Sequence, residues 1–288
     1  MKESQDLIYR INTYYKDMSK GQKVIAEYIL DSYDRAAFMT ASKLGKKVGV
    51  SESTVVRFAN ALNYTGYPQL QKALQELVRN KLTTVQRIQM TSELDQSMTI
   101  KSVLKSDMSN IRMTIDEIDN EGFENIVDRV FLAETIYVLG LRSAAPLAEF
   151  MGYYLSFMFS NIRVVTSGVN DIFEQTMHIG PKDLLIGISF PRYASRTIEA
   201  MEFAKNKGAE IVAITDSYLS PLTNYADYTL LARSDMVSFV DSLVAPLSLI
   251  NALIVAISLK HKEDISSRFS KLEDIWEKYN VYVGRKNQ

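Results

Sequence analysis

The sequence predicts a two-domain protein, in which a small all-α domain precedes an α/β domain with a doubly wound parallel sheet. Three observations predict this architecture. A helix-turn-helix pattern lies at residues 40–62, apolar strands alternate with helices after residue 134, and 288 residues suit two separate cores. We place the helical domain at 1–81, a linker and the start of a connecting helix at 82–106, the α/β domain at 107–262 and a C-terminal helix at 263–288.

Composition favours a cytoplasmic protein with a polyanionic partner. Cys is absent, so disulfides and thiolate chemistry are excluded. No apolar run reaches bilayer-spanning length, and MKESQDLIYR lacks a signal-peptide core, so we expect no membrane partner. The net charge of −1 hides a split: residues 1–81 hold 13 Lys+Arg and 8 Asp+Glu, and the excess lies within 40–81. A single basic segment in an otherwise acidic chain predicts contact with a polyanion such as DNA.

The stretch TASKLGKKVGVSESTVVRFANAL at 40–62 predicts two short helices joined by a sharp turn. Thr40 and Ser51 are suitable N-caps, and Gly49 stands where the turn needs positive φ. The second helix is expected at Glu52–Leu62. Its buried stripe, at helical spacing, is Val55, Phe58, Ala59 and Leu62. This pattern is typical of a helix-turn-helix, although an ordinary helical hairpin shares the same elements.

The outer face of the second helix has no core role and is predicted to lie in a DNA major groove. Arg57 and Asn60 would face base edges, and Val56 would meet a thymine methyl group. Lysines of the first helix would bind phosphates, which fixes position without reading sequence. The predicted DNA-contacting residues are Lys43, Lys46, Lys47, Ser51, Glu52, Ser53, Thr54, Val56, Arg57, Asn60 and Tyr67. An aromatic residue beside a turn, such as Tyr67, is more often a packing residue than a phosphate contact, and Glu52 equally suits the positive end of the helix dipole.

Further helices are expected around this motif and after it. Residues 1–39 predict two helices, the second starting near Ser19, and a turn at Gly66 and Pro68 precedes another helix. Residues 82–99 have the weak periodicity of a linker. The expected apolar stripes are Val24, Ile25, Tyr28 and Ile29; Leu70, Leu74 and Leu77; Ile100, Leu104, Ile111, Ile115 and Ile118; and Phe123, Ile126, Val127 and Val130.

From residue 135 the pattern changes to that of buried strands. Strands are predicted at 135–139, 163–165, 183–189, 210–215 and 228–231, and helices at 146–159, 169–178, 196–207 and 241–260. Such alternation implies a parallel sheet covered on both faces. The C-terminal stretch carries Ile265, Phe269, Leu272, Trp276 and Tyr279 near the period of a coiled-coil seam, so that this face covers either its own domain or another subunit.

Polar residues gather where the predicted strands end. In an open parallel sheet ligands bind at the carboxyl ends of the strands, where helix N-termini offer free N–H groups to anions, and arginine suits phosphate or carboxylate. The candidate residues for a small anionic effector are Gly140, Arg142, Ser143, Ser167, Ser189, Arg192, Tyr193 and Ser195. Alternatively, the two arginines pair with acidic side chains or lie in a subunit interface.

Other kinds of site are disfavoured. GLRSAAP after the first strand lacks the second and third glycines of the dinucleotide fingerprint, and no GxxxxGK[ST] loop is present, so we expect no cofactor. Glu174 and His178 lie one helical turn apart and are able to act as acid and base or to bind metal, but such a pair is more often a surface feature. We therefore predict no catalytic residues and no metal site.

The segment SKLGKKVGVSESTVVRFANAL followed by TGYPQLQKAL resembles the N-terminal domain of RpiR-type bacterial transcription regulators. The second half resembles their sugar isomerase (SIS) domain, a Rossmann-like three-layer fold, in DLLIGIS, AKNKGAEIVAITDS and SPLTNYADYTL. The resemblance implies a regulator, by default a repressor of carbohydrate-related genes, that binds a double-stranded DNA operator. It further implies that the SIS domain senses a phosphosugar-like effector and that the chain forms homodimers or tetramers.

Two loops depart from the family pattern. Such domains carry a phosphate loop of the form S-x-S-G-x-T after the third strand, whereas SFPRYA at 189–194 keeps only the first hydroxyl. The glycine-rich loop after the first strand becomes GLRSA at 140–144. Both losses coincide with a gained arginine, so we expect charged side chains to replace cradling by backbone groups. Three alternatives stay open: a pocket that serves dimerisation only, a sugar-phosphate isomerase with an accessory helical domain, and a helical domain that binds protein.

Overall fold

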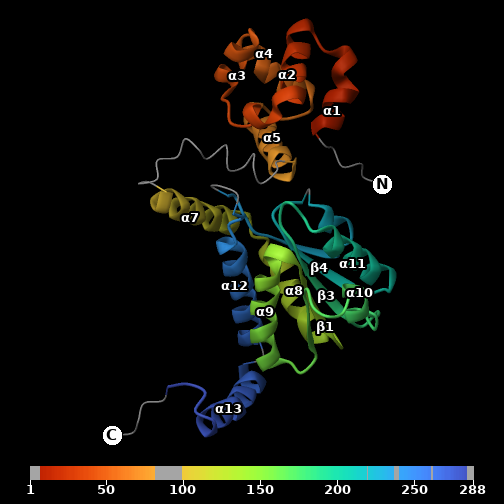
Figure 1. Cartoon of the computed structure of the whole chain (residues 1–288), viewed down its shortest axis with the longest axis vertical. Coiled ribbons are helices and arrows are strands. Elements are labelled where there is room, and N and C mark those ends of the chain that lie inside the picture. The colour runs from red at the N-terminus through yellow and green to blue at the C-terminus, as the bar shows by residue number, and fades with distance from the viewer. Residues whose placement is uncertain (1–6, 82–98, 219, 237–239, 261, 284–288) are drawn as a thin grey trace. The chain divides into compact units, whose positions relative to one another are not determined.

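The computed structural model describes residues 7–81, 99–218, 220–236, 240–260 and 262–283 (Figure 1). The chain divides into two compact units, residues 1–90 and 91–288. Of the linker predicted at 82–99, residues 82–98 lie outside the described residues, and so does the side chain of Leu77. In the part of the chain that the structure describes, no single helix is long and apolar enough to cross a bilayer.

The first unit is built from short helices around one apolar core. The helices are α1 (Leu7–Tyr14), α2 (Lys20–Ala36), α3 (Ala41–Val48), α4 (Glu52–Ala61) and α5 (Tyr67–Lys81). The predicted start of α2 is confirmed, because Ser19 and Gln22 form a reciprocal capping box. Val24 was expected in the core and is exposed, since α2 turns Ile25 and Ile29 inward instead.

The predicted helix-turn-helix is formed by α3 and α4. Thr40 Oγ1 caps α3 by accepting from Lys43 N at 3.2 Å, and Gly49 ends it with φ of 76°. Gly45 allows the close approach between the two helices: a Cβ there would lie 2.8 Å from Val50 O. Both the turn and the crossing therefore depend on glycine. Leu44, Val55, Phe58 and Leu62 are fully buried beneath them.

The second unit contains the predicted parallel sheet. Its described strands are β1 (Ile136–Gly140), β2 (Ile162–Val165), β3 (Leu184–Ile188), β4 (Glu210–Thr215) and β5 (Tyr228–Leu231). They lie in the order β2-β1-β3-β4-β5, and every neighbouring pair is parallel. The chain leaves β1 toward one edge and returns at β3 on the other side of β1. The point at which the winding reverses therefore lies between β1 and β3.

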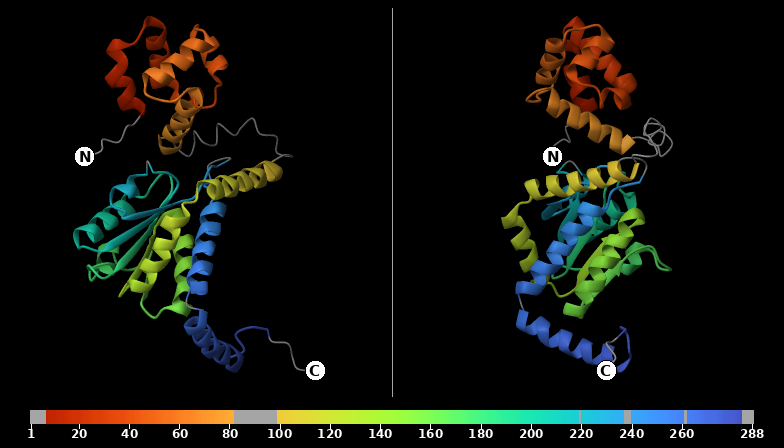
Figure 2. Two further views of the ribbon diagram at one scale, coloured as in Figure 1. Left: turned by 180° about the vertical axis from the view of Figure 1, so that it is seen from behind. Right: turned by 90° about the vertical axis from the view of Figure 1, so that its left-hand side faces the viewer.

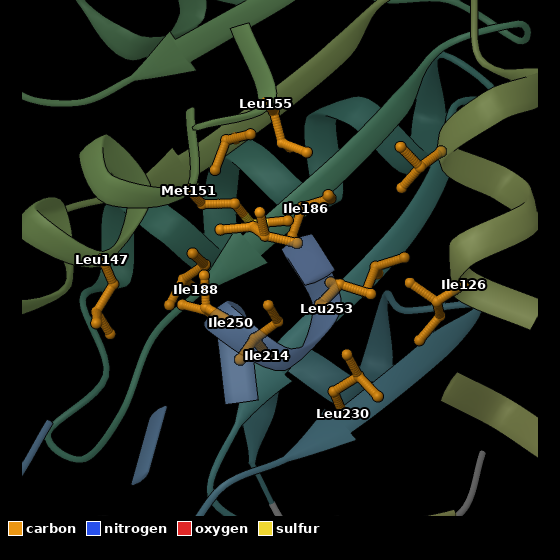
Figure 3. Packing of buried hydrophobic residues seen from close by; sticks show 14 of the residues in the cluster. Ile126, Leu147, Met151, Leu155, Ile186, Ile188, Ile214, Leu230, Ile250 and Leu253 are labelled. Atoms are coloured by element: carbon orange, nitrogen blue, oxygen red, sulfur yellow. The ribbon is translucent and has the colours of Figure 1, made fainter. Parts of the chain in front are cut away.

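Helices cover both faces of the sheet, as in a three-layer Rossmann-like fold (Figure 2). On one face lie α8 (Asn120–Leu132), α9 (Ala145–Met158) and α12 (Val244–Lys260), and on the other lie α10 (Ile172–Gln175) and α11 (Ser195–Asn206). Figure 3 shows Ile186, Ile188 and Ile214 of the sheet packed among Met151 and Leu155 of α9 and Ile250 and Leu253 of α12. α13 (Lys262–Lys278) follows α12 and places Phe269 and Trp276 against Phe157 of α9.

α7 (Thr99–Glu117) precedes the sheet and differs from its prediction in one respect. Its expected apolar stripe does not face its own core, because Ile100, Leu104 and Ile115 are 75%, 58% and 65% exposed. The buried side chains on this helix are the polar residues Asn110 and Thr114. The helical spacing was therefore recognised correctly, but the side of the helix that packs on the domain was not.

Candidate functional site

The first candidate site is the outer face of α4. Ser51 caps this helix by accepting from Thr54 N at 3.2 Å, which satisfies a free N–H group at the start of α4. The inner face, with Val55, Phe58 and Ala59, is fully buried. Because these apolar residues fix the rotation of α4 about its axis, the polar residues at the complementary positions point to solvent.

Most of the predicted DNA-contacting residues are exposed on α3 and α4. The exposed ones are Lys43, Lys46, Lys47, Ser51, Glu52, Ser53, Arg57 and Asn60. Thr54 and Val56 are half-buried, and Val56 packs partly on the core. Arg57 is ordered along the helix, because its Nη2 donates to Thr54 Oγ1 at 3.3 Å. The surface thus offers hydroxyl, guanidinium and amide groups from one helix, which suits hydrogen bonding to base edges.

The position of Tyr67 contradicts the role predicted for it. Its ring is buried, and its hydroxyl donates to Met39 O at 2.7 Å. Burial raises the pKa of the Tyr67 hydroxyl to about 12. Tyr67 therefore packs α5 against the segment before α3 and is not available to a phosphate group.

Arg10 of α1 holds the far end of α4, a contact that sequence spacing does not reveal. Its Nη1 donates to Leu62 O at 2.9 Å and to Asn63 O at 3.3 Å, and its guanidinium lies 4.7 Å from the ring centroid of Tyr64. A cation at a helix C-terminus binds carbonyl groups that lack partners within the helix and complements the helix dipole. α4 is thus fixed at its start by Ser51 and at its end by Arg10.

The second candidate site lies at the carboxyl ends of β1, β2 and β3. Arg142 and Ser143 follow β1, and Ser189, Arg192 and Tyr193 follow β3, so the two loops flank the reversal point of the sheet. This is where open parallel sheets bind ligands. Arg142 and Ser143 are exposed, and Arg142 has φ of 56°, an uncommon value for a residue with a side chain.

The other candidate residues at this end have different environments. Gly140 is buried, and a Cβ there would lie 2.6 Å from Ala144 O, so its lack of a side chain serves packing. Ser167 is exposed in the loop after β2, on the far side of β1 from the reversal point. Ser195 is the exposed first residue of α11.

Hydrogen bonds within the fold use several polar groups of the β3 loop. Ser189 is buried, and its Oγ accepts from Ala194 N at 3.3 Å, which closes the loop on itself. The Tyr193 hydroxyl donates to Asp216 Oδ1 at 2.8 Å, and Thr215 Oγ1 donates to the same oxygen at 3.3 Å. Asp216 is a buried carboxylate at the end of β4. The loop after β3 is thereby tied to the end of the neighbouring strand.

Two carboxylates accompany the two arginines at this end of the sheet, and the predicted site residues included neither. One is Asp216, whose place after a buried strand was a usable sequence signal. The other is Asp241, whose Oδ2 accepts from Ser143 Oγ at 3.4 Å across 98 positions of sequence. No local sequence pattern predicts the contact between Ser143 and Asp241. The site therefore combines positive and negative groups.

The Glu174–His178 pair does not share a helix as expected. α10 ends at Gln175, and Glu174 Oε2 accepts from Asp171 N at 3.1 Å as part of a capping box. The Glu174 carboxylate therefore stabilises the start of α10. Among the described residues, no three His, Cys, Asp or Glu side chains are grouped to hold a metal ion.

Comparison with known proteins assigns both halves of the chain. Residues 5–81 match the helix-turn-helix domain of the rpiR family, and residues 131–256 match the SIS domain. An HTH-type transcriptional regulator of Haemophilus influenzae, itself uncharacterized, is 29% identical over 276 residues, which cover 93% of this chain and 95% of that protein.

Solved structures agree with this assignment at the level of the fold. The sugar isomerase domain of an RpiR transcription factor from Sphaerobacter thermophilus is 26% identical with a TM-score of 0.59, and the match covers 62% of this chain and 99% of that one. Vibrio vulnificus NanR, solved with ManNAc-6P, shares the fold over 96% of this chain and all of its own, at 20% identity and a TM-score of 0.59. Residues 5–81 thus form a helix-turn-helix domain of the rpiR family and residues 131–256 a SIS domain, and the relative that spans nearly the whole chain is named an HTH-type transcriptional regulator.

Proposed function

We propose that this regulator is a homo-oligomeric repressor that binds operator DNA through α4. Its affinity for the operator would change when its SIS domain binds an anionic sugar derivative. The observation that carries the DNA-binding part is the division of α4 into two faces. Val55 and Phe58 are fully buried, whereas Ser53, Arg57 and Asn60 are exposed at helical spacing. A face with polar, hydrogen-bonding side chains and no core role suits a recognition helix.

The lysines of α3 support the same proposal. Lys43, Lys46 and Lys47 are exposed on the helix that precedes the recognition helix. In a docked helix-turn-helix the first helix crosses the DNA backbone, so these lysines would neutralise phosphates. Lys46 and Lys47 also stand in the last turn of α3, where positive charge complements the helix dipole.

The strand-end site supports an effector that has both an anionic group and hydroxyl groups. Arg142 and Arg192 supply guanidinium groups that suit a phosphate, and Asp216 and Asp241 supply carboxylates that accept from sugar hydroxyls. A phosphosugar carries both kinds of group, and NanR of the same fold was solved with ManNAc-6P. Binding must favour one arrangement of subunits if it is to change the affinity for DNA.

The proposal is tested by the binding of the full-length chain to the DNA upstream of its own gene. We expect sequence-selective binding that weakens steeply with salt, and a change in affinity when phosphosugars are added one at a time. Equal affinity for a shuffled duplex of the same composition would contradict the regulatory function. Selective DNA binding without a response to any sugar phosphate would contradict only the effector assignment.

A further inference from the structure

We propose that Thr54 is a positioning residue that holds the Arg57 guanidinium in place for base reading, a role that rests on the proposed docking of α4 in a DNA major groove. The two residues lie three positions apart on α4, so their side chains are neighbours on the helix surface. A long side chain that is free in solution loses rotamer freedom when it binds, and this loss weakens binding. A contact that restricts Arg57 before DNA arrives lowers that cost.

The bond between the two side chains leaves most of the guanidinium available. Arg57 Nη2 donates to Thr54 Oγ1 at 3.3 Å, and the threonine oxygen accepts because a guanidinium group only donates. Among the residues that the structure describes, this is the one hydrogen bond of the Arg57 side chain, and no carboxylate pairs with it. The other N–H groups of Arg57 therefore remain free to donate to a base edge.

The same bond directs the guanidinium toward the start of α4. Thr54 stands in the first turn of this helix, which begins at Glu52. In a docked helix-turn-helix the N-terminal residues of the recognition helix contact base edges. Arginine reads guanine through two bonds, to O6 and N7, and this reading requires a correctly oriented planar group. Thr54 thus places Arg57 at the end of α4 that approaches the bases.

Thr54 is itself fixed on two sides. Its methyl group lies against Gly21 of α2, since a Cβ on that glycine would be 3.3 Å from Thr54 Cγ2. Its Oγ1 lies 2.9 Å from the hydroxyl oxygen of Ser51, the N-cap residue of α4. Threonine in a helix has two accessible side-chain rotamers. Packing on Gly21 and the bond to Ser51 together select the rotamer whose hydroxyl meets Arg57.

The hydroxyl groups at the start of α4 form a chain that ends at Arg57. Ser51 Oγ lies 2.9 Å from Ser53 Oγ and 2.9 Å from Thr54 Oγ1. Hydrogen bonds linked in this way polarise and strengthen one another. Thr54 is half-buried, whereas Ser53 and Arg57 are exposed. Its position therefore suits a residue that acts through Arg57 rather than one that contacts a base itself.

The test measures the affinity of the full-length chain for a duplex that the wild type selects from a randomised library, and for versions changed at one base pair each. The base pair read by Arg57 is the one at which Arg57→Ala loses discrimination. Thr54→Val keeps the contact with Gly21 and the backbone bond to Ser51 but removes the hydroxyl. We expect discrimination at that base pair to fall about three- to tenfold. Its dependence on salt should not change, because no charge is removed.

Two further variants separate positioning from other roles. Thr65→Val is the matched control, because Thr65 is exposed in the same unit and its Oγ1 donates to Gln69 Oε1 at 3.2 Å. It should bind like the wild type. Thr54→Ser retains the hydroxyl and should recover most of the discrimination. In an Arg57→Ala background, Thr54→Val should have no further effect at that base pair, because a positioning residue acts only through its partner.

The outcomes distinguish this proposal from the proposed function. Unchanged discrimination in Thr54→Val would overturn the positioning role alone. So would an equal loss with and without Arg57, which would indicate that Thr54 contacts DNA directly. If the library yields no preferred sequence, the proposed function fails and the positioning role fails with it.

A second measurement requires no DNA. NMR relaxation of the arginine Nε–H groups in the full-length chain reports how freely each side chain moves, and the Arg57 signal is the one that Arg57→Ala removes. We expect this group to move more freely in Thr54→Val than in the wild type or Thr65→Val. Thr54→Ala removes the same hydroxyl without branching at Cβ and replaces Thr54→Val if that variant does not fold. Equal mobility in all of these proteins would overturn the proposal.

Discussion

On α4 the residues proposed to meet DNA project from a single helix, whereas the residues proposed to meet the effector come from loops after several strands. The α4 face is fixed from beneath by fully buried Val55 and Phe58, and its polar groups are left to solvent. At the strand ends, Ser189 and Tyr193 already bond to Ala194 and Asp216 within the fold. Side chains at the strand ends therefore both stabilise the loop and are candidates to bind the ligand.

This difference predicts two kinds of mutational behaviour. A substitution on the outer face of α4 changes recognition and leaves the free energy of unfolding nearly unchanged. A substitution at the strand ends changes both quantities, because the removed group has a partner within the protein. Five predictions test this contrast, from the largest expected effect to the smallest.

The largest effect is expected from Gly45→Val, which disrupts the packing of α3 against the proposed recognition helix α4. Its Cβ would lie 2.8 Å from Val50 O, a backbone atom that cannot move aside cheaply. We expect a loss of about 3 kcal/mol or more in unfolding free energy and the loss of DNA binding, measured by thermal melting and gel shift. Gly168→Val is the control, since the nearest atom to its Cβ is Gln175 Nε2 at 4.0 Å. Equal melting temperatures for the two variants would contradict the close-packing role of Gly45.

The next effect is expected from Arg192→Ala at the effector site. A ligand at one hundred times its Kd stabilises the folded state by about 2.7 kcal/mol, and we expect most of that gain to vanish without the guanidinium. Thermal shift with the most stabilising phosphosugar provides the measurement. Equal shifts in wild type and variant would remove the idea that arginine replaces the missing serines and glycine.

Arg57→Ala and Lys46→Ala together test the proposed DNA-contacting surface of α3 and α4. We expect Arg57→Ala to relax specificity at one base position at a cost of about 1–3 kcal/mol, because it removes a contact with a base edge. Lys46→Ala should weaken binding to all sequences alike and reduce its dependence on salt, because it removes a phosphate contact. Titrations on operator and mismatched duplexes distinguish these outcomes, and identical behaviour of the two variants would contradict the assignment.

Tyr193→Phe and Asn60→Ala compare the two regions directly. Tyr193→Phe removes a donor to the buried Asp216 carboxylate, so we expect a loss of about 1 kcal/mol in unfolding free energy. Asn60→Ala changes an exposed residue of α4 and should stay within about 0.5 kcal/mol of wild type. Urea unfolding measures both. A stable Tyr193→Phe beside a destabilised Asn60→Ala would reverse the comparison.

The smallest effect concerns pH and Tyr67. Its pKa is raised by burial to about 12, against about 10 in an unfolded chain. The unfolded chain therefore releases this proton between pH 10 and pH 12 while the folded chain keeps it, so stability falls as pH rises through that window. We expect the fall to be steeper for wild type than for Tyr67→Phe in urea unfolding. Identical slopes would show that the hydroxyl is not shielded.

The elements that the sequence predicts well depend on local chemistry. The limits of α3 and α4 follow from Thr40, Gly49 and Ser51, each of which acts within a few residues of itself. The helix expected at 169–178 is wrong in length, because α10 spans Ile172–Gln175 and Gln175 Nε2 turns back to bond Thr166 O and Asn170 O. Periodicity describes a continuous helix and does not include such a return contact.

What the sequence does not predict depends on contacts between distant positions. The burial of Tyr67 against Met39, the bond from Ser143 to Asp241 and the outward direction of the α7 stripe all require the assembled fold. In α7 the period alone cannot tell an inward apolar face from an outward one. Buried Asn110 and Thr114 distinguish the two cases, because their hydrogen-bond partners are backbone groups of Asp235 and Arg233, in the segment that follows β5 and far along the chain.

The bonds from Arg10 to the carbonyls of Leu62 and Asn63, just after α4, make α1 part of the support of the proposed recognition helix. A minimal DNA-binding fragment that begins after α1 would keep every residue proposed to contact bases and lose the guanidinium that bonds to the carbonyls at the end of α4. Efforts to redirect such a regulator to a new operator should therefore exchange Ser53, Arg57 and Asn60 and leave Arg10 in place. The change of operator would then require only three substitutions on a helix whose position in the domain is kept.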